Sequence, residues 1–186
     1  MGAGRVFDNL KDFALFERVL AGVCLLTPLV LIGLDGWPAR NSISAYYSIA
    51  GNQWFYFLLT AAVMMFVVNA FVREQHYYNL VLGIGLALIV LFNHKDSVVA
   101  HFAGVILFFA GNVVVIALFS RGPGLKIKLT FLAVMTLALV ALLLPWWTLF
   151  WAEWLSMAAI AGHFLLDSSP YEYQAIPRGD RPSLAA

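Results

Sequence analysis

Six apolar segments alternate with short polar stretches along the chain. A helix needs about 20 apolar residues to cross the hydrocarbon core of a membrane, and most of these segments approach or exceed that length. The pattern therefore predicts an all-α fold, a six-helix transmembrane bundle that forms one domain over residues 1–167. We expect the helices at about 16–35, 52–72, 77–93, 98–120, 127–144 and 147–167.

The two ends of the chain follow a different pattern. Apolar and charged residues alternate within residues 1–18, Glu17 among them, which predicts a short amphipathic helix on the membrane surface. Residues 168–186 contain three prolines and predict a poorly ordered tail.

Lys and Arg residues are distributed unequally between the two sides of the predicted bundle. If the N-terminus is inside, nine of them face the cytoplasm, whereas only Arg40 and Lys95 face the other side. Cytoplasmic loops of membrane proteins carry such an excess, so we expect both termini in the cytoplasm.

Composition agrees with a polytopic membrane protein. Apolar and aromatic residues make up 62% of the chain and charged residues 11%, compared with about 25% in soluble domains. A net charge of +1 without a basic cluster argues against a nucleic-acid partner. Membrane lipid is the expected partner, and a homo-oligomer is compatible with the sequence.

The last apolar segment carries an unusual polar stripe. Steps of three, seven and four residues place Glu153, Ser156, His163 and Asp167 on one helical face. Ionised groups facing lipid are costly, so this stripe should face other helices or a wet cavity. For His163 and Asp167, near the cytoplasmic end, helix capping or snorkelling is the simpler interpretation.

Two other segments that run in the same direction carry similar stripes. One contains Gln53, Tyr56, Thr60 and Met64, and the other contains Ser97, His101, Gly104, Phe108 and Asn112. The simplest packing puts all three stripes against one another and forms a cavity open to the extracytoplasmic side. We expect Asn69 and Asn112 to form hydrogen bonds between helices.

Loops 35–48 and 93–97 would cover the mouth of this cavity. Hydroxyl-rich and aromatic residues in the first loop suit a polar head group, while the apolar walls suit its chain. The sequence therefore favours binding of a lipid head group or small amphiphile. The predicted ligand-binding residues are Ser44, Tyr46, Tyr47, Gln53, Tyr56, His101, Glu153 and Ser156.

Other functions use the same residues, and the sequence leaves open whether the protein is an enzyme. A membrane-embedded hydrolase could use Glu153 and His101 as catalytic acid and base, or hold zinc with His94, Asp96 and His101. Glu153 and His101 could also be a structural pair that fixes helix register. A small transporter would need a polar path continuing through Asn112 and His163.

Three short motifs resemble a group of small, uncharacterised bacterial membrane proteins. These motifs are the run Ser42-Ile43-Ser44-Ala45-Tyr46-Tyr47, a His opening the fourth helix at His101, and Trp151-Ala152-Glu153 in the last helix. The resemblance to this domain of unknown function implies a bacterial inner-membrane location and no known activity.

Overall fold

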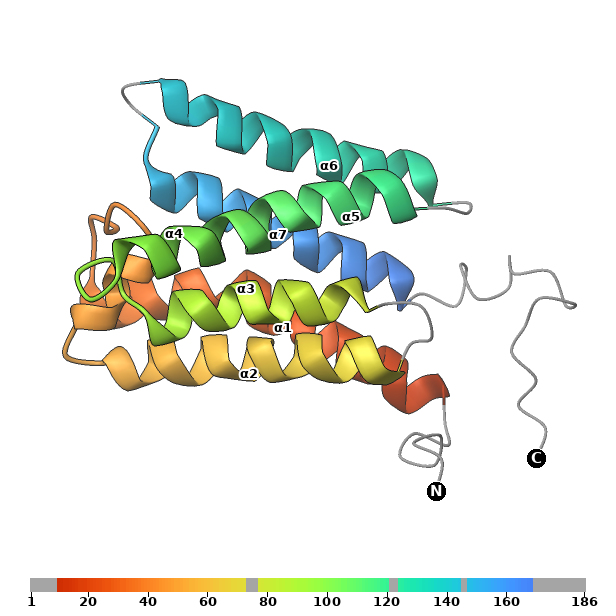
Figure 1. The fold of residues 1–186 in the computed structure, drawn as a ribbon, viewed down its shortest axis with the longest axis horizontal. Helices are drawn as coiled ribbons and strands as arrows, with labels where there is room; N and C mark the ends of the chain where they lie inside the picture. Colours follow the sequence, from red (N-terminus) through yellow and green to blue (C-terminus); the bar gives the residue numbers. More distant parts are fainter. Residues whose placement is uncertain (1–9, 73–76, 121–123, 145–146, 169–186) are drawn as a thin grey trace, which may run out of the picture.

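A computed structural model describes residues 10–72, 77–120, 124–144 and 147–168, and these residues are helical with short connections (Figure 1). The helices lie within a few residues of the predicted bounds, which confirms the all-α prediction. The elements are α1 (Leu10–Asp35), η2 (Ser44–Ser48), α2 (Asn52–Val72), α3 (Tyr78–Leu91), α4 (Val98–Val105), η3 (Ile106–Ala110), α5 (Gly111–Phe119), α6 (Leu125–Val140), η4 (Ala141–Leu143) and α7 (Leu149–Asp167).

Five helical stretches within the described residues are long and apolar enough to cross a membrane. The helix α3 is also apolar but shorter, with 14 residues. The fold is therefore that of a membrane protein, as expected. Residues 10–18 begin α1 instead of forming a separate surface helix, and residues 1–9 and the tail 169–186 lie outside the described residues.

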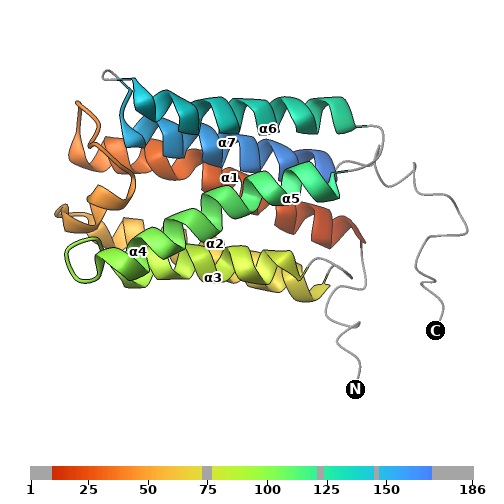
Figure 2. The ribbon, with the colours of Figure 1, turned by 45° about the horizontal axis from the view of Figure 1, so that its top comes forward.

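The helices form a ring in which sequence neighbours pack side by side. The last helix, α7, also packs against the first helix, α1, and this contact closes the ring (Figure 2). The connections at residues 36–51, 92–97, 141–144 and 147–148 lie together at one end, here called the loop end (Figure 1). The start of α1 and the end of α7 lie at the opposite, terminal end.

The membrane-spanning stretch Val98–Phe119 is continuous but not uniformly α-helical. One turn of π-helix, η3, separates α4 from α5. Beside it, α3 approaches so closely that a Cβ added at Gly104 would lie 2.7 Å from the carbonyl oxygen of Gly85. Glycine at both positions therefore allows backbone contact between the two helices.

Alternate helices of the ring meet at its centre through aromatic side chains. Phe66 of α2 makes edge contacts with Phe108 of η3 and Phe164 of α7, with ring centroids 5.5 and 5.4 Å apart. The predicted stripes of the fourth and last segments are largely buried, whereas the predicted inward-facing stripe of α2 is wrong. Thr60 and Met64 are exposed, because their face of α2 points away from the bundle.

The polar stripe of α7 does face the protein, as predicted. Glu153, Ser156, Ile160 and His163 are all at least nine-tenths buried. Burial inside the ring spares these polar groups contact with lipid.

Candidate functional site

The segment Asn41–Ala45 crosses the loop end and is held by the start of α7. The backbone N–H of Ile43 donates to Glu153 Oε2 at 2.6 Å, and the N–H of Phe150 donates to the carbonyl of Asn41 at 2.7 Å. Both Ile43 and Glu153 are buried. Because Glu153 accepts this buried bond from a loop amide, it fixes the position of the segment.

Tyr46 anchors the following turn, η2. Its side chain is fully buried against Phe150, and its hydroxyl accepts from the backbone N–H of Arg40 at 3.2 Å. The Arg40 guanidinium donates to both carboxylate oxygens of Asp35, and this hydrogen bonding raises the pKa of Arg40 above its usual value. The predicted head-group residue Tyr46 therefore supports the loop from inside.

His101 lies beneath this segment with a defined hydrogen bond. Its Nδ1 is 2.8 Å from the carbonyl oxygen of Phe92. A carbonyl only accepts hydrogen bonds, so Nδ1 carries a proton, and in the neutral ring Nε2 is then an acceptor. His94 lies beside His101, with ring centroids 6.2 Å apart.

An open groove of about 520 Å³ lies at the loop end between α4, the segment Asn41–Ala45 and the start of α7. Hydroxyl, amide and imidazole groups line it together with four apolar side chains. The lining residues are Asn41, Ser42, Ser44, Ala45, His94, His101, Phe102, Val105, Thr148 and Leu149.

The predicted ligand-binding residues divide into three groups. Ser44 and His101 line the groove. Tyr46, Glu153 and Ser156 are buried, and Tyr47 is partly buried with its ring edge against His94. Gln53 and Tyr56 are exposed on α2, because the polar face of that helix turns outward, so the structure does not bring them to the groove.

The suggested pairs and metal ligands are arranged differently from the prediction. Glu153 bonds to Ile43 and His101 to Phe92, so the two side chains use separate backbone partners. Asp96 bonds to Asn93 in the exposed 93–97 turn. No three His, Cys, Asp or Glu side chains in the described ranges form a metal-binding group, whereas zinc sites use three or four protein ligands.

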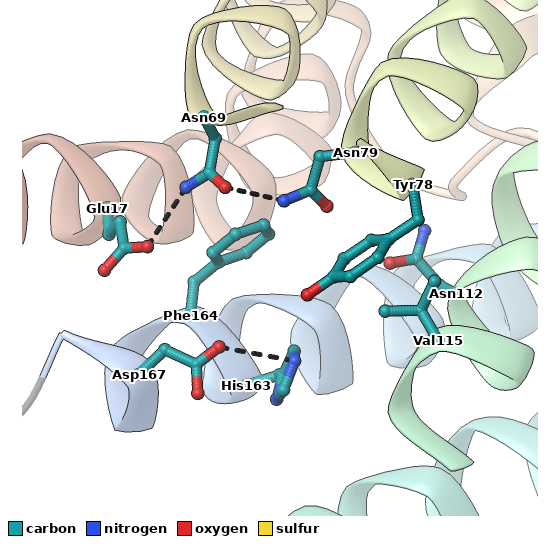
Figure 3. A pocket seen from close by; sticks show the side chains of 9 residues that line it. All are labelled: Glu17, Asn69, Tyr78, Asn79, Asn112, Val115, His163, Phe164 and Asp167. Carbon is teal, nitrogen blue, oxygen red and sulfur yellow. Dashed lines mark hydrogen bonds and ion pairs between the residues drawn. The ribbon is translucent and has the colours of Figure 1, made fainter. Parts of the chain in front are cut away.

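A second polar group of residues, here called the terminal-end cluster, lies at the opposite end of the bundle (Figure 3). Asn79 Nδ2 donates to Asn69 Oδ1 at 2.6 Å, and Asn69 Nδ2 donates to Glu17 Oε1 at 3.0 Å. These bonds join α3, α2 and α1 and confirm the predicted interhelical role of Asn69. The cluster comprises Glu17, Asn69, Tyr78, Asn79, Asn112, Lys128, His163 and Asp167.

An ion-paired group forms the other side of this cluster. Lys128 Nζ lies 2.7 Å from Asp167 Oδ1, and His163 Nε2 lies 3.4 Å from Asp167 Oδ2. The Lys128 side chain is only 4% exposed. These contacts tie α6 to α7, so Asp167 joins two helices and is more than a helix cap. Asn112 donates to the carbonyl of Phe108 in its own helix, and the predicted interhelical bond is not among its contacts.

Sequence reasoning missed the terminal-end cluster because its members are single polar residues in different segments. Glu17 was expected on the membrane surface, and Lys128 was counted among the Lys and Arg residues that face the cytoplasm, yet both are buried. The distance of each residue from its helix end could have revealed the cluster. Glu17, Asn69 and Asn79 all lie within about two turns of a helix end, and these three ends are on the same side of the bundle.

Comparison with known proteins places these features in a family without assigning a function. No curated protein and no solved structure matches the chain. One family model, described as a family of unknown function (DUF7103), matches residues 26–168. This range contains the whole loop-end groove and most of the bundle, and it agrees with the resemblance to uncharacterised proteins. The chain therefore belongs to the DUF7103 family.

Proposed function

We propose that this membrane protein binds an amphiphile with an uncharged, hydroxyl-bearing head group in the loop-end groove. The observation that carries the proposal is that both polar and apolar side chains line the groove. Asn41, Ser44 and Thr148 supply polar groups, while Phe102 and Val105 of α4 supply apolar surface. An amphiphile needs both kinds of contact.

The apolar lining continues onto a surface where an acyl chain can lie. Phe102 lines the groove and is 50% exposed, and Val98 and Val99 on the same helix are 56% and 82% exposed. An acyl chain that lies along this surface keeps its own apolar groups out of water, which is worth about 25 cal/mol per Å². The groove volume of about 520 Å³ also lies within the usual range of about 300–1,000 Å³ for small-molecule sites.

The polar lining favours a neutral head group over an anionic one. None of the residues that line the groove is Lys, Arg, Asp or Glu. With Nδ1 protonated, a neutral His101 offers Nε2 as an acceptor, and the hydroxyls of Ser44 and Thr148 both donate and accept. Sugar or glycerol hydroxyls match this mixture, whereas a phosphate would meet no permanent positive charge.

The hydrolase alternative finds less support in the geometry. Its proposed base, Glu153, is buried behind the segment Asn41–Ala45 and accepts the Ile43 N–H. A general base must reach the proton that it removes, directly or through one water. In the binding proposal, Glu153 instead holds the polar edge of the groove in place.

The charge distribution and the bacterial resemblance support a bacterial inner-membrane location with the groove on the extracytoplasmic side. In that orientation the groove meets the outer leaflet of the inner membrane. Head groups exposed in this leaflet are the candidate ligands.

Mass spectrometry of the untagged full chain, purified in mild detergent, tests the proposal. We expect one lipid class with hydroxylated, uncharged head groups to remain bound at one copy per chain. Val105→Trp should fill the groove and release this lipid. The matched control, Val114→Trp, places the same side chain on the exposed side of α5, away from the groove, and should retain the lipid.

Two results would contradict the proposal. One is retention of the same lipid by Val105→Trp and by the unmodified chain. The other is exclusive retention of anionic phospholipids, which would overturn the assignment of the head group.

A further inference from the structure

Two polar groups that line the loop-end groove are oriented by the protein and are left with bonding capacity to spare. One is the pair of hydroxyls on Ser42 and Ser44, and the other is the imidazole of His101. Ser44 and His101 are 7% and 4% exposed, so they are nearly buried. Buried polar atoms normally have hydrogen-bond partners, and spare capacity on such atoms in a groove indicates where a ligand binds.

The two serine hydroxyls supply one hydrogen that the protein does not use. The Ser42 hydroxyl accepts from the backbone N–H of Ala45 at 3.1 Å, and its oxygen lies 3.0 Å from that of Ser44. Each hydroxyl has one hydrogen, so whichever serine donates within the pair, the hydrogen of the other remains. Neither side chain makes a further bond within the described part of the chain. The pair therefore offers one donor to the groove.

His101 offers an acceptor in the same groove. Its Nδ1–H donates to the carbonyl oxygen of Phe92 at 2.8 Å, which leaves Nε2 of the neutral ring with a free lone pair. The bond to Phe92 also fixes the orientation of the ring, and among the described residues no donor is bonded to Nε2. A ligand therefore meets a donor and an acceptor whose directions are set before it binds, which lowers the cost of binding.

The only titratable side chain that lines the groove beside His101, among the described residues, is His94. The two ring centroids are 6.2 Å apart, and the other edge contact of His94 is with Tyr47. The remaining charged or titratable side chains of the loop end lie outside the lining; they are Asp35, Arg40, Tyr46, Tyr47, Tyr56, Lys95, Asp96 and Glu153. Proton uptake within the groove is therefore confined to the two imidazoles.

We propose that the groove recognises a sugar head group through these two groups. One sugar oxygen accepts from the serine pair, and one sugar hydroxyl donates to His101 Nε2. This assignment rests on the proposed binding of an amphiphile and names the class of its head group. A sugar carries hydroxyls at several ring positions, so it can satisfy a donor and an acceptor that are not adjacent. A quaternary ammonium group offers neither bond, and an ionised phosphodiester has no hydrogen to donate.

Binding of dodecyl glucoside to the full chain in lipid nanodiscs, measured by native mass spectrometry, tests the assignment. The fully O-methylated glucoside keeps every oxygen but cannot donate a hydrogen to Nε2. It should therefore bind about tenfold more weakly than dodecyl glucoside at about pH 8, where imidazole is neutral. This comparison uses the unmodified chain and does not depend on the folding of any variant.

The pH dependence of this preference tests the role of His101. At about pH 5 an imidazolium donates through Nε2, and both ligands can accept that bond, so the preference should shrink severalfold. His101→Gln has an amide whose charge does not change with pH, so its preference should be the same at both values. His94→Gln is the matched control and should keep the pH dependence of the unmodified chain.

Serine variants test the donor. The double variant Ser42→Ala/Ser44→Ala removes both hydroxyls and should bind dodecyl glucoside about tenfold more weakly. Each single variant keeps one hydroxyl hydrogen and should lose less than the double variant. The backbone bond from Ala45 to the Ser42 carbonyl remains in all of them. Ser48→Ala removes an exposed hydroxyl outside the groove and should not change binding.

Three results would overturn the sugar assignment. They are equal binding of the two ligands at about pH 8, a preference in the unmodified chain that does not change with pH, and a double serine variant that binds like the unmodified chain. Val105→Trp distinguishes these failures from failure of the amphiphile proposal. If it releases both ligands, the groove still binds an amphiphile, whereas ligands that stay bound to Val105→Trp would overturn both proposals.

Discussion

Replacing Glu153 with alanine should release the segment Asn41–Ala45 without unfolding the bundle. The change removes the acceptor of the Ile43 N–H bond, which is 2.6 Å long and buried. Leaving a buried N–H without its acceptor costs about 1–3 kcal/mol. The bond between Phe150 and Asn41 remains, so the effect should stay local.

Hydrogen–deuterium exchange at the Ile43 amide measures this effect directly. A loss of about 1–3 kcal/mol corresponds to exchange about 5- to 150-fold faster, since 1.4 kcal/mol is a factor of ten. Glu153→Gln keeps a side-chain oxygen that accepts, so its exchange should rise only about twofold.

Ser156→Ala is the matched control one turn further along α7. The Ser156 hydroxyl is buried and has no hydrogen-bond partner, so its removal should leave Ile43 protected. Unchanged exchange in Glu153→Ala would refute the argument that this carboxylate holds the segment.

Three further predictions concern the helices and their orientation. Gly104→Ala should destabilise the protein by about 1–3 kcal/mol, because its Cβ would lie 2.7 Å from the Gly85 carbonyl oxygen. Gly22→Ala is the control, since nothing lies within 4 Å of its added Cβ, and it should not destabilise the protein. Tryptophan fluorescence during thermal unfolding measures both variants. Lys128→Met should lower the free energy of unfolding by about 3 kcal/mol or more, because it removes the lysine that pairs with Asp167. Adding Asp167→Leu should recover much of this loss in the same unfolding assay. A double variant as unstable as Lys128→Met alone would contradict this pairing. In a Cys24→Ala background, a membrane-impermeant maleimide should label Lys95→Cys on intact cells and Lys126→Cys only after permeabilisation, and the reverse result would invert the predicted topology.

The sequence predicted the helices well because a bilayer imposes a simple requirement on composition and length. The second segment, for example, was expected at 52–72 and is observed at Asn52–Val72. The stripe of Glu153, Ser156 and His163 was also predicted to face the protein, since the cost of exposing such groups to lipid decides their side. Both results depend on local pattern alone.

The partners of these residues depend on contacts between distant segments, which local pattern does not specify. Glu153 and His101 share a depth, but each bonds to a nearby loop carbonyl or amide. Gln53 and Tyr56 form a polar stripe near a helix end, where exposure at the membrane interface costs little, so their stripe does not determine which side of α2 faces inward. The environment of Lys128 was equally hard to predict, because a charged side chain near a helix end can either reach water or pair with a buried group.

The π-helical turn Ile106–Ala110 determines how one membrane-crossing stretch contributes to both ends of the bundle. It lies between His101, which bonds to Phe92, and Asn112, which belongs to the terminal-end cluster. A π turn contains about one residue more than an α turn, so deleting one residue within it would restore regular α-helix and leave both halves facing as they do now. A deletion within α4 or α5 would instead rotate one half of the stretch against the other by about 100°, and either the imidazole or the amide would then point toward acyl chains. A one-residue deletion should therefore be tolerated better in this turn than in the α-helical parts on either side.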